Sequence, residues 1–175
     1  VNAPNVNTFG AFNYDLSVQY ADNTGVAVNS LGFGDVWITG PNGFSSFLLL
    51  INTTPSSNNA AVTGLYRLMP PGGYWDSSDN GTYTVTLMRD QVKDIAGNAN
   101  GAVVVDTFDV VIPPRVLSPV GNTAEQRPVI HWQAVVGAGA YDLWINNLTT
   151  GQNAIVNTTI MLPQFQPPAG LGLGT

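Results

Sequence analysis

The stretch Asp79-Asn80-Gly81-Thr82-Tyr83-Thr84-Val85 carries the clearest structural signal in this 175-residue chain. Asp, Asn and Gly favour turns, because Asp and Asn side chains cap the local backbone and Gly accepts left-handed angles. From Thr82 to Leu87 polar and apolar residues alternate, which is typical of a β-strand with one buried face. The stretch therefore predicts a turn that leads into an amphipathic strand.

Further strands are predicted on both sides of this stretch. Gly, Pro and Asn clusters such as Gly40-Pro41-Asn42-Gly43 and Asp22-Asn23-Thr24-Gly25 bound them, and helical periodicity is hard to find anywhere. The other predicted strands cover residues 9–12, 16–20, 35–39, 44–51, 61–69 and 103–112. About seven short strands in roughly 112 residues predict an antiparallel β-sandwich of two sheets.

The spacing Asp-x-Gly-x-Tyr-x-apolar in residues 79–85 resembles the tyrosine corner of immunoglobulin-like sandwiches, in which the Tyr hydroxyl bonds back to the upstream backbone. Val85 stands where antibody domains carry their second Cys. The other interpretation is a plain turn before an amphipathic strand. Residues 9–112 as a whole resemble the bacterial immunoglobulin-like (cadherin-like) repeats of large surface and secreted proteins. The matching stretches are 20–26, 36–43, 75–85 and 93–98. The resemblance implies a β-sandwich and no enzyme activity.

A change in composition predicts two domains. The run Val110-Val111-Ile112 ends at Pro113-Pro114, which cannot donate ladder hydrogen bonds and stiffens the chain. Residues 1–112 carry the whole net charge of −6, whereas residues 113–175 hold two acidic and two basic residues. We therefore expect an immunoglobulin-like module over residues 1–112 and a second module over residues 113–175.

The second module resembles a fibronectin type III domain that lacks its last strands. Residues 128–133 resemble strand B with its core Trp132, residues 139–145 resemble strand C, and residues 151–160 supply a hairpin and part of the next strand. Leu162-Pro163 and Gly174-Thr175 match the approach to the strand that should follow. The resemblance implies an open core and an unpaired sheet edge, which favours self-association through a neighbouring chain. The alternative is that the Gly- and Pro-rich tail is a mobile terminus.

The composition excludes several classes of function. Charged residues make up only 9% of the chain, and the net charge of −6 leaves no surface for neutralising phosphates, so nucleic-acid binding is not expected. The longest apolar run, residues 47–51, is far shorter than the roughly 20 residues of a membrane helix, so no membrane insertion is expected. The absence of Cys excludes thiol chemistry and disulfide scaffolds.

The same composition favours an extracellular or cell-surface location. Asn, Thr, Gly and Ser replace Lys and Glu almost everywhere, as in secreted bacterial surface proteins. Val1 is not an initiator Met, so we expect the segment to be part of a longer chain. Four Asn-x-Thr sequons, at Asn52, Asn80, Asn147 and Asn157, would accept glycans in a eukaryotic secretory pathway but also arise readily by chance.

No motif for catalysis is present in the sequence. The single His131 lies in a predicted strand, and no Gly-x-Ser-x-Gly elbow surrounds any Ser. Asp76 and Asp79 are close in sequence, but no cleft can be argued for a glycosidase pair. The chain is therefore not expected to be an enzyme, and it requires no cofactor.

Calcium is the one metal hypothesis with a physical basis. The predicted topology brings five oxygen-bearing side chains to one end of the first sandwich, and Ca²⁺ prefers oxygen ligands. These residues are Asp22, Asn23, Asp90, Asp94 and Asn98, with Asp76 and Asp79 as a lesser pair near the opposite end. The competing interpretation is that Asp and Asn are there because they cap turns.

Exposed aromatic rings could in turn bind glycans by stacking on sugar faces. Tyr74-Trp75, on a loop after Pro70-Pro71-Gly72-Gly73, is the candidate pair, and packing under the sheet edge is the alternative. Trp37 and Trp144 lie inside predicted strands and are expected in the core or half-buried.

The sequence thus favours a non-catalytic structural or adhesive spacer of a large bacterial extracellular protein, whose partners are neighbouring domains of the same parent chain. One alternative is an accessory, glycan-binding module of a secreted hydrolase. Another is a subunit of a surface filament whose second module is completed by a neighbour's strand.

Overall fold

The computed structural model of the protein describes residues 1–135 and 137–171. It is all-β, with antiparallel sheets joined by turns and short 3-10 segments, so the predicted all-β class of sandwich modules is confirmed. The chain divides into two compact units, Val1–Ile112 and Pro113–Thr175. The division falls immediately before Pro113-Pro114, where the sequence analysis placed the linker. Each unit is described by itself below.

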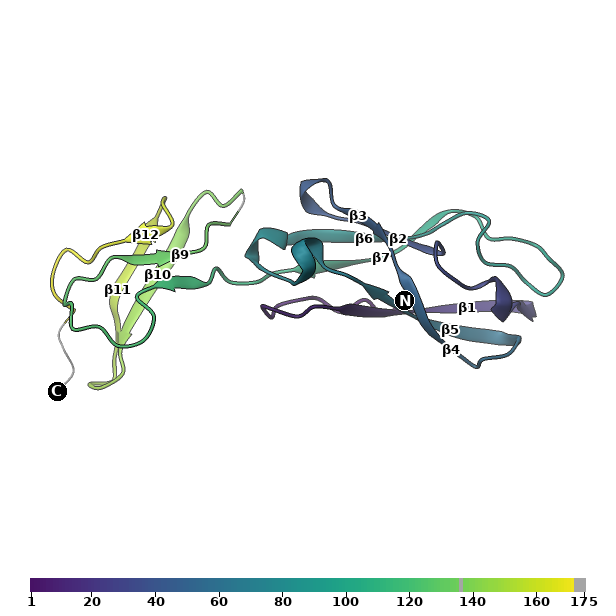
Figure 1. Ribbon diagram of the computed structural model, residues 1–175, viewed down its shortest axis with the longest axis horizontal. Helices are drawn as coiled ribbons and strands as arrows, with labels where there is room; N and C mark the ends of the chain where they lie inside the picture. Colours follow the sequence, from purple (N-terminus) through teal and green to yellow (C-terminus); the bar gives the residue numbers. More distant parts are fainter. Residues whose placement is uncertain (136, 172–175) are drawn as a thin grey trace. The chain divides into compact units, whose positions relative to one another are not determined.

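The first unit consists of two antiparallel sheets that lie as separate layers (Figure 1). One sheet has the order β1-β5-β4, and its strands are β1 (Tyr14–Val26), β4 (Leu49–Thr54) and β5 (Asn59–Leu68). The other has the order β3-β2-β6-β7, and its strands are β2 (Val36–Thr39), β3 (Ser45–Phe47), β6 (Gly81–Leu87) and β7 (Val103–Val110). The 3-10 segments are η1 (Val28–Ser30), η2 (Pro41–Gly43), η3 (Pro71–Gly73) and η4 (Ser77–Asp79).

The first residues of the chain add to both sheets. Asn2 bridges Ser17 of β1 in an antiparallel sense, and Val6 bridges Val110 of β7 in a parallel sense. The strand predicted at residues 9–12 does not form. Instead, the backbones of Gly10 and Ala11 exchange hydrogen bonds with the backbone of Trp75, so this segment is held by a loop and not by a sheet. The pairing segment therefore lies earlier in the chain than the apolar pattern indicated.

The single long strand predicted over residues 44–51 is also wrong, because the chain changes sheets within it. β3 belongs to one sheet and β4 to the other. The crossing residue, Leu48, is fully buried, and its N–H donates to the carbonyl of Val36 at 3.0 Å. A continuous apolar run suits either sheet, so the sequence pattern contains no sign of the change.

β1 continues beyond the turn predicted at residues 22–25. Its register with β5 shifts between Ala21 and Val26, so residues 22–25 form an irregular bulge inside the strand and not the loop at its end. Gly25 adopts a φ of 108° there, which only Gly accepts without strain. A bulge and a turn need the same residue types, which explains why residues 22–25 were predicted to be a turn at the end of the strand.

The corner before β6 forms as the resemblance implied. The Tyr83 hydroxyl donates to the backbone carbonyl of Asp79 at 3.0 Å, and the whole side chain is buried. Two glycines make room for this corner. A Cβ on Gly40 would lie 2.4 Å from Cε1 of Tyr83, and a Cβ on Gly81 would lie 2.5 Å from Cγ of Pro41. The corner is thus fixed by a hydrogen bond and by close packing together.

Aromatic rings from both layers form the centre of the core. Tyr83 stacks on Phe108 of β7 with ring centroids 5.0 Å apart, and Phe108 stacks on Tyr14 of β1 at 4.2 Å. Trp75 meets Tyr83 edge to face at 5.3 Å. Because Tyr14 comes from one sheet and Tyr83 and Phe108 from the other, this cluster joins the two sheets.

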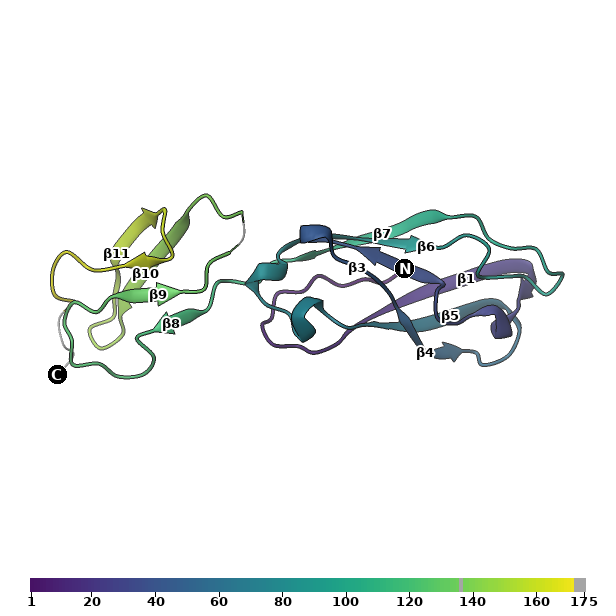
Figure 2. The same cartoon turned by 45° about the horizontal axis from the view of Figure 1, so that its top comes forward.

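The second unit contains two smaller sheets (Figure 2). One has the order β12-β9-β8, with β8 (Val116–Ser118), β9 (Ile130–Trp132) and β12 (Gln164–Phe165). The other consists of β10 (Tyr141–Asn147) and β11 (Gln152–Ile160). The strands expected around Trp132 and at residues 139–145 are present, and residues 152–160 form one continuous strand. Gly174-Thr175 lies outside the described residues.

The two units differ sharply in their cores. The first unit buries twenty hydrophobic side chains in one cluster. In the second unit Trp132 is the one buried hydrophobic side chain among those that the structure describes, apart from prolines. Since burial of apolar area is the main source of folding free energy, the stability of the chain resides mostly in the first unit.

Replacing Tyr83 by Phe should destabilise the first unit by about 1–2 kcal/mol, because the buried carbonyl of Asp79 loses its donor while the ring packing remains. Urea unfolding followed by Trp fluorescence measures this. Tyr74→Phe is the matched control, since Tyr74 is exposed, and its effect should stay within about 0.5 kcal/mol. Equal effects of the two changes would show that the Asp79 hydrogen bond does not stabilise the corner.

Candidate functional site

The residues expected to hold calcium are only partly brought together. Asp22 in the β1 bulge and Asp94 in the loop between β6 and β7 are linked through Thr24, whose hydroxyl lies 2.5 Å from Asp22 Oδ1 and 3.4 Å from Asp94 Oδ2. Asp22 Oδ1 also accepts the N–H groups of Thr24 and Gly25. These bonds hold the pKa of the Asp22 carboxyl below its usual range, with the Thr24 hydroxyl as the largest cause.

Asp94 is occupied in the same way. Its Oδ1 accepts the backbone N–H of Asn98 at 2.8 Å, and its Oδ2 accepts the Asn98 side-chain amide at 2.6 Å. The Asn98 side chain is the first cause of the lowered pKa of the Asp94 carboxyl. The amide of Asn98 therefore presents its donor, and not its oxygen, to Asp94. This contact closes the loop and does not prepare a ligand for a cation.

The remaining members of the set are less well placed for a cation. Asp90 and Asp94 line one shallow hollow, but Lys93 lines it too, and a positive side chain opposes cation binding. Asp90 has a φ of 64°, the left-handed region that Asp tolerates in turns, and Asn23 is exposed on the bulge. Among residues 1–135 and 137–171, no three His, Asp or Glu side chains are grouped so that they could hold a metal ion. The geometry thus favours turn capping over a calcium centre, and calcium binding itself stays a hypothesis.

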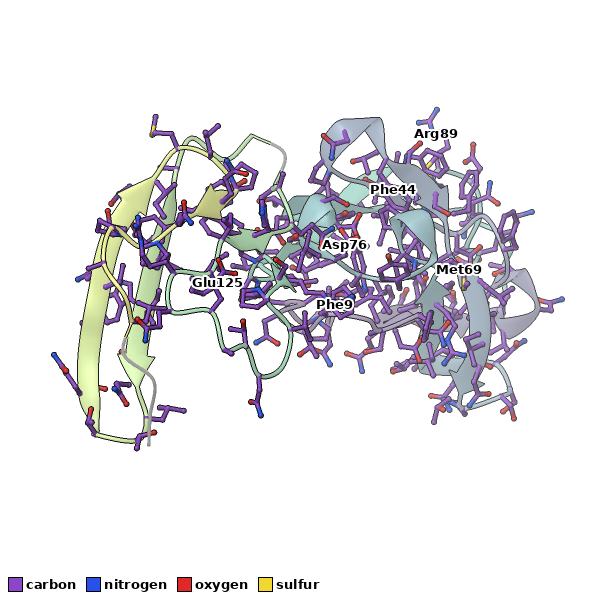
Figure 3. All side chains as sticks on the ribbon, turned by 60° about the vertical axis from the view of Figure 1, so that its left-hand side comes forward. Phe9, Phe44, Met69, Asp76, Arg89 and Glu125 are labelled. Carbon is purple, nitrogen blue, oxygen red and sulfur yellow. The ribbon has the colours of Figure 1, made fainter. Side chains whose placement is uncertain are left out.

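Asp76 and Asp79 form a helical capping box around η4 (Asp76 is labelled in Figure 3). Asp76 Oδ1 accepts the backbone N–H of Ser78 at 2.7 Å, and Asp79 Oδ2 accepts the N–H of Asp76 at 3.0 Å. Burial raises the pKa of the Asp79 carboxyl. Both carboxylates therefore stabilise the local turn, which in turn positions the carbonyl of Asp79 to accept the Tyr83 hydroxyl. The contacts of this pair are thus structural.

The pair Tyr74-Trp75 does not form a glycan platform. Trp75 is only 1% exposed and lies inside the aromatic core, so no sugar can stack on its ring in the folded protein. The assignment of Trp75 to glycan binding is therefore wrong. Tyr74 is partly exposed, and its ring contacts Phe9 and Phe12 edge to face at 5.7 and 6.4 Å. The Pro- and Gly-rich loop folds inward at Trp75 because the Gly10-Ala11 backbone pairs with it.

The two strand tryptophans differ in environment. Trp37 of β2 is half-buried, as expected, and its ring lies 4.4 Å from that of Phe47. Trp144 of β10 was also expected to be buried at least in part, yet it is 67% exposed. It lies on the more exposed face of β10 and borders an open cavity beside that strand, so its place in a strand did not bury it. The single His131 is half-buried in β9 opposite Gln164.

Sequence reasoning missed a buried series of hydrogen-bonded polar side chains in the first unit, called the polar chain below. Asp35, immediately before β2, is 1% exposed, and its Oδ2 accepts the Tyr66 hydroxyl and the N–H of Gly32, both at 2.7 Å. The hydroxyl of Tyr66 also lies 2.8 Å from that of Tyr20. Burial raises the pKa of the Asp35 carboxyl, and the hydrogen bonds from Gly32 and Tyr66 offset part of that rise.

This polar chain joins the two layers, because Tyr20 and Tyr66 belong to β1 and β5 whereas Asp35 leads into the other sheet. A Cβ on Gly64 would lie 2.6 Å from Cε2 of Tyr66, so Gly64 makes room for the ring. These buried hydrogen bonds therefore form a structural connection between the sheets.

No protein-family model matches the chain, and a search of curated proteins returns no match. Within the part of the chain that the structure describes, no helix is long and apolar enough to cross a membrane.

The stability of the first unit should depend on pH through Asp35. Its pKa is raised on folding, so its favourable contribution is complete below the carboxyl's ordinary pKa, at about pH 4, and is lost as the pH rises through the folded pKa. Asp35→Asn removes this titration, so the variant should gain stability relative to the native protein as the pH rises. Urea unfolding of both proteins from acid to neutral pH measures the difference. Parallel pH curves would contradict the role of Asp35.

Removing the cap at Asp22 should lower the midpoint of thermal unfolding, because three donors from Thr24 and Gly25 lose their acceptor. Asp22→Ala is compared with Asn23→Ala, which changes an exposed neighbour in the same bulge. Because Oδ1 of Asp22 and both carboxylate oxygens of Asp94 already accept protein donors, millimolar Ca²⁺ should leave both midpoints unchanged. A rise in the native midpoint on adding Ca²⁺, abolished in Asp22→Ala, would instead establish the calcium site.

Proposed function

We propose that the chain is a non-catalytic, load-bearing spacer from a large bacterial extracellular or cell-surface protein, with an immunoglobulin-like module followed by an incomplete fibronectin type III-like module. Its partners in this role are the neighbouring domains of the same parent chain. The proposal needs no catalytic group, cofactor or membrane segment. Its support comes from strand order, from the Tyr83 corner and from the way the first residues of the chain are anchored.

The strand order of the first unit supports the immunoglobulin-like part of the proposal. In such sandwiches strands A, B, E and D form one sheet, and C, F and G form the other. The order β1-β5-β4, with Asn2 bridging β1, fits A-B-E-D, and the order β3-β2-β6-β7 fits C′-C-F-G. Tyr83 also makes its backbone hydrogen bond at the start of the strand that takes the place of F.

The second unit supports the incomplete fibronectin-like part by the same reasoning. The order β12-β9-β8 fits strands E, B and A, and the pair β10-β11 fits C and C′. The next strand of that fold would lie beside β10, on the edge opposite β11. Among the described residues no strand occupies that edge.

The load-bearing role depends on one observation: the beginning and end of the first unit are held side by side by parallel pairing. The N–H of Val6 donates to the carbonyl of Asp109 at 2.9 Å, and the N–H of Val111 donates to the carbonyl of Val6 at 2.8 Å. Asn5 Oδ1 accepts the N–H of Asp109 at 2.8 Å. Tension along the chain pulls two parallel segments in opposite directions, so these bonds are loaded in shear and must break together.

Replacing Val6 by Pro should lower the force at which the first unit unfolds, because Pro cannot donate to the Asp109 carbonyl. The equilibrium stability should fall by about 1 kcal/mol for the lost hydrogen bond. Single-molecule stretching of tandem copies measures the force. Thr8→Pro places the same ring two residues later, beyond the paired residue, and serves as control. An unfolding force unchanged by Val6→Pro would contradict the load-bearing role of this segment.

A further inference from the structure

One edge of the second unit is a strand with no partner in the described part of the chain. β10 pairs with β11 on one side, from Tyr141 opposite Ile160 to Ile145 opposite Val156, and no described strand pairs with it on the other side. Burial alternates along β10, so Tyr141, Leu143 and Ile145 lie on the more buried face and Asp142 and Trp144 on the exposed face. The strand therefore offers an amphipathic edge with free backbone groups.

An apolar cavity of about 470 Å³ lies beside this edge. Its lining comes from the second unit alone. It includes Trp132 and Val116, together with residues from both faces of β10: Tyr141 and Leu143 on the more buried face, and Asp142 and Trp144 on the exposed face. Nε1 of Trp132 is buried with no hydrogen-bond partner. An open apolar cavity next to an unpaired strand indicates a sandwich whose interior is incompletely covered.

The usual protection of an edge strand is weak on β10. Natural edges carry Lys, Pro or bulges, which block pairing with another chain. The sequence of β10 contains no Lys, Arg or Pro, and its one charge is Asp142. The register irregularity near Asn147 arises from extra residues in β11, so β10 itself stays regular.

Two edge strands of the first unit, β4 and β7, are better protected than β10. β4 contains a bulge between Leu50 and Asn52, and β7 carries Asp106 and Asp109 and is partly covered by Val6. Unlike β4 and β7, β10 has neither extra residues of its own at a bulge nor a covering segment, so it is open to pairing.

We propose that β10 pairs antiparallel with β10 of a second copy of this chain, in a register centred on Trp144. All seven residues of the strand overlap only in this register. Trp144 then lies opposite Trp144 of the second copy, and Leu143 lies opposite Ile145. The two short sheets join into one four-stranded sheet with the order β11-β10-β10-β11. The pairing goes beyond the spacer function and does not require it.

The charges of β10 suit a second copy in this register. Asp142 lies opposite Asn146, whose amide can donate to the carboxylate, so the two carboxylates are not opposed. A register centred on Asp142 would place the two carboxylates face to face and leave Ile145 unpaired. Like charges directly opposite destabilise a strand pair, and paired aromatic rings stabilise it.

The two-fold arrangement also matches the alternation of more buried and exposed residues along β10. A two-fold axis perpendicular to the sheet places the more buried faces of both strands on the same side. Leu143 and Ile145 of the second copy then extend the apolar layer beside the cavity. On the outer side, the two Trp144 rings, each 67% exposed in the single chain, cover one another. Apolar surface on both faces of the sheet leaves water together, which favours association.

Engineered cysteines test the register directly, because the native chain contains no Cys. Residues directly opposite in an antiparallel pair have Cβ atoms about 4.5–5.5 Å apart, close enough for a disulfide to form with small adjustments. Trp144→Cys in the full chain should give a disulfide-linked dimer under mild oxidation, as seen on a non-reducing gel. Asp142→Cys, which faces Asn146, should crosslink weakly.

A second control separates register from exposure. Thr159 of β11 is the cross-strand partner of Asp142 and is exposed on the same face of the sheet. A Cys at Thr159 is therefore as accessible as one at Asp142, but it lies on β11, away from the proposed interface. It should give no disulfide-linked dimer on the same non-reducing gel. Crosslinking of Asp142→Cys or Thr159→Cys as strong as that of Trp144→Cys would overturn the proposal.

Oligomeric state without cysteines gives an independent measurement. The mass from sedimentation equilibrium should rise from 18.5 kDa towards twice that value between low and several hundred micromolar protein. Trp144→Lys should raise the dimer Kd by at least about tenfold, since the ring pair is lost and two positive charges meet. Circular dichroism should be unchanged, because Trp144 is exposed. A native chain that stays monomeric, or a dimer insensitive to Trp144→Lys, would overturn the pairing and leave the stretching behaviour of the first unit unaffected.

Discussion

The fit of the Tyr83 ring between the two sheets is the contact on which most of the first unit depends. Its hydroxyl closes the turn before β6, and its face stacks on Phe108 of β7. The edge of Trp75 packs against it, and Trp75 lies on the loop that arrives from β5. Three features of the chain, namely a turn, a neighbouring strand and a crossover loop, therefore meet at one side chain. Because interiors are close-packed, a change at this position affects all three.

That contact also explains residues whose sequence environment is otherwise plain. Gly40 must lack a side chain because the Tyr83 ring occupies the space, and Gly81 must lack one because Pro41 does. Gly81 also has a φ of 139°, which few other residues accept. The capping box of Asp76 and Asp79 fixes the carbonyl that Tyr83 binds. Polar residues that resemble a ligand set in the sequence thus serve the packing of one aromatic ring.

Sequence reasoning succeeded where local chemistry decides the structure and failed where distant pairing decides it. The corner at Tyr83 and the amphipathic strand after it follow from residues within one short stretch, so they could be predicted. The change of sheet at Leu48 depends on which strands lie beside the chain, and an apolar run fits both sheets equally. The bulge after Ala21 uses turn residues, and only its pairing with β5 distinguishes it from a loop.

The candidate sites failed for a related reason. Trp75 follows Pro and Gly residues, which usually indicate an exposed loop, and its burial depends on backbone bonds to residues more than sixty positions away. Asp35 gives no sequence signal, because a carboxylate before a strand normally faces water. Its burial is tolerated only because Tyr66 and Gly32 supply donors. Asp22 and Asp94 were recognised as possible oxygen ligands for a cation. Their carboxylates instead accept hydrogen bonds from residues of their own turns.

The uneven distribution of charge bears on how copies of this chain approach each other. The first unit carries the whole charge of −6, which repels an identical surface, and the second unit carries none. A chain with only 9% charged residues has few charges with which to protect its sheet edges. In the first unit, acids on β7 and the pairing of the first residues supply that protection. In the second unit neither is present beside β10, and among the described residues Trp132 is the one buried hydrophobic side chain apart from prolines. Electrostatics and burial therefore both favour the second unit over the first as the place where two copies would meet.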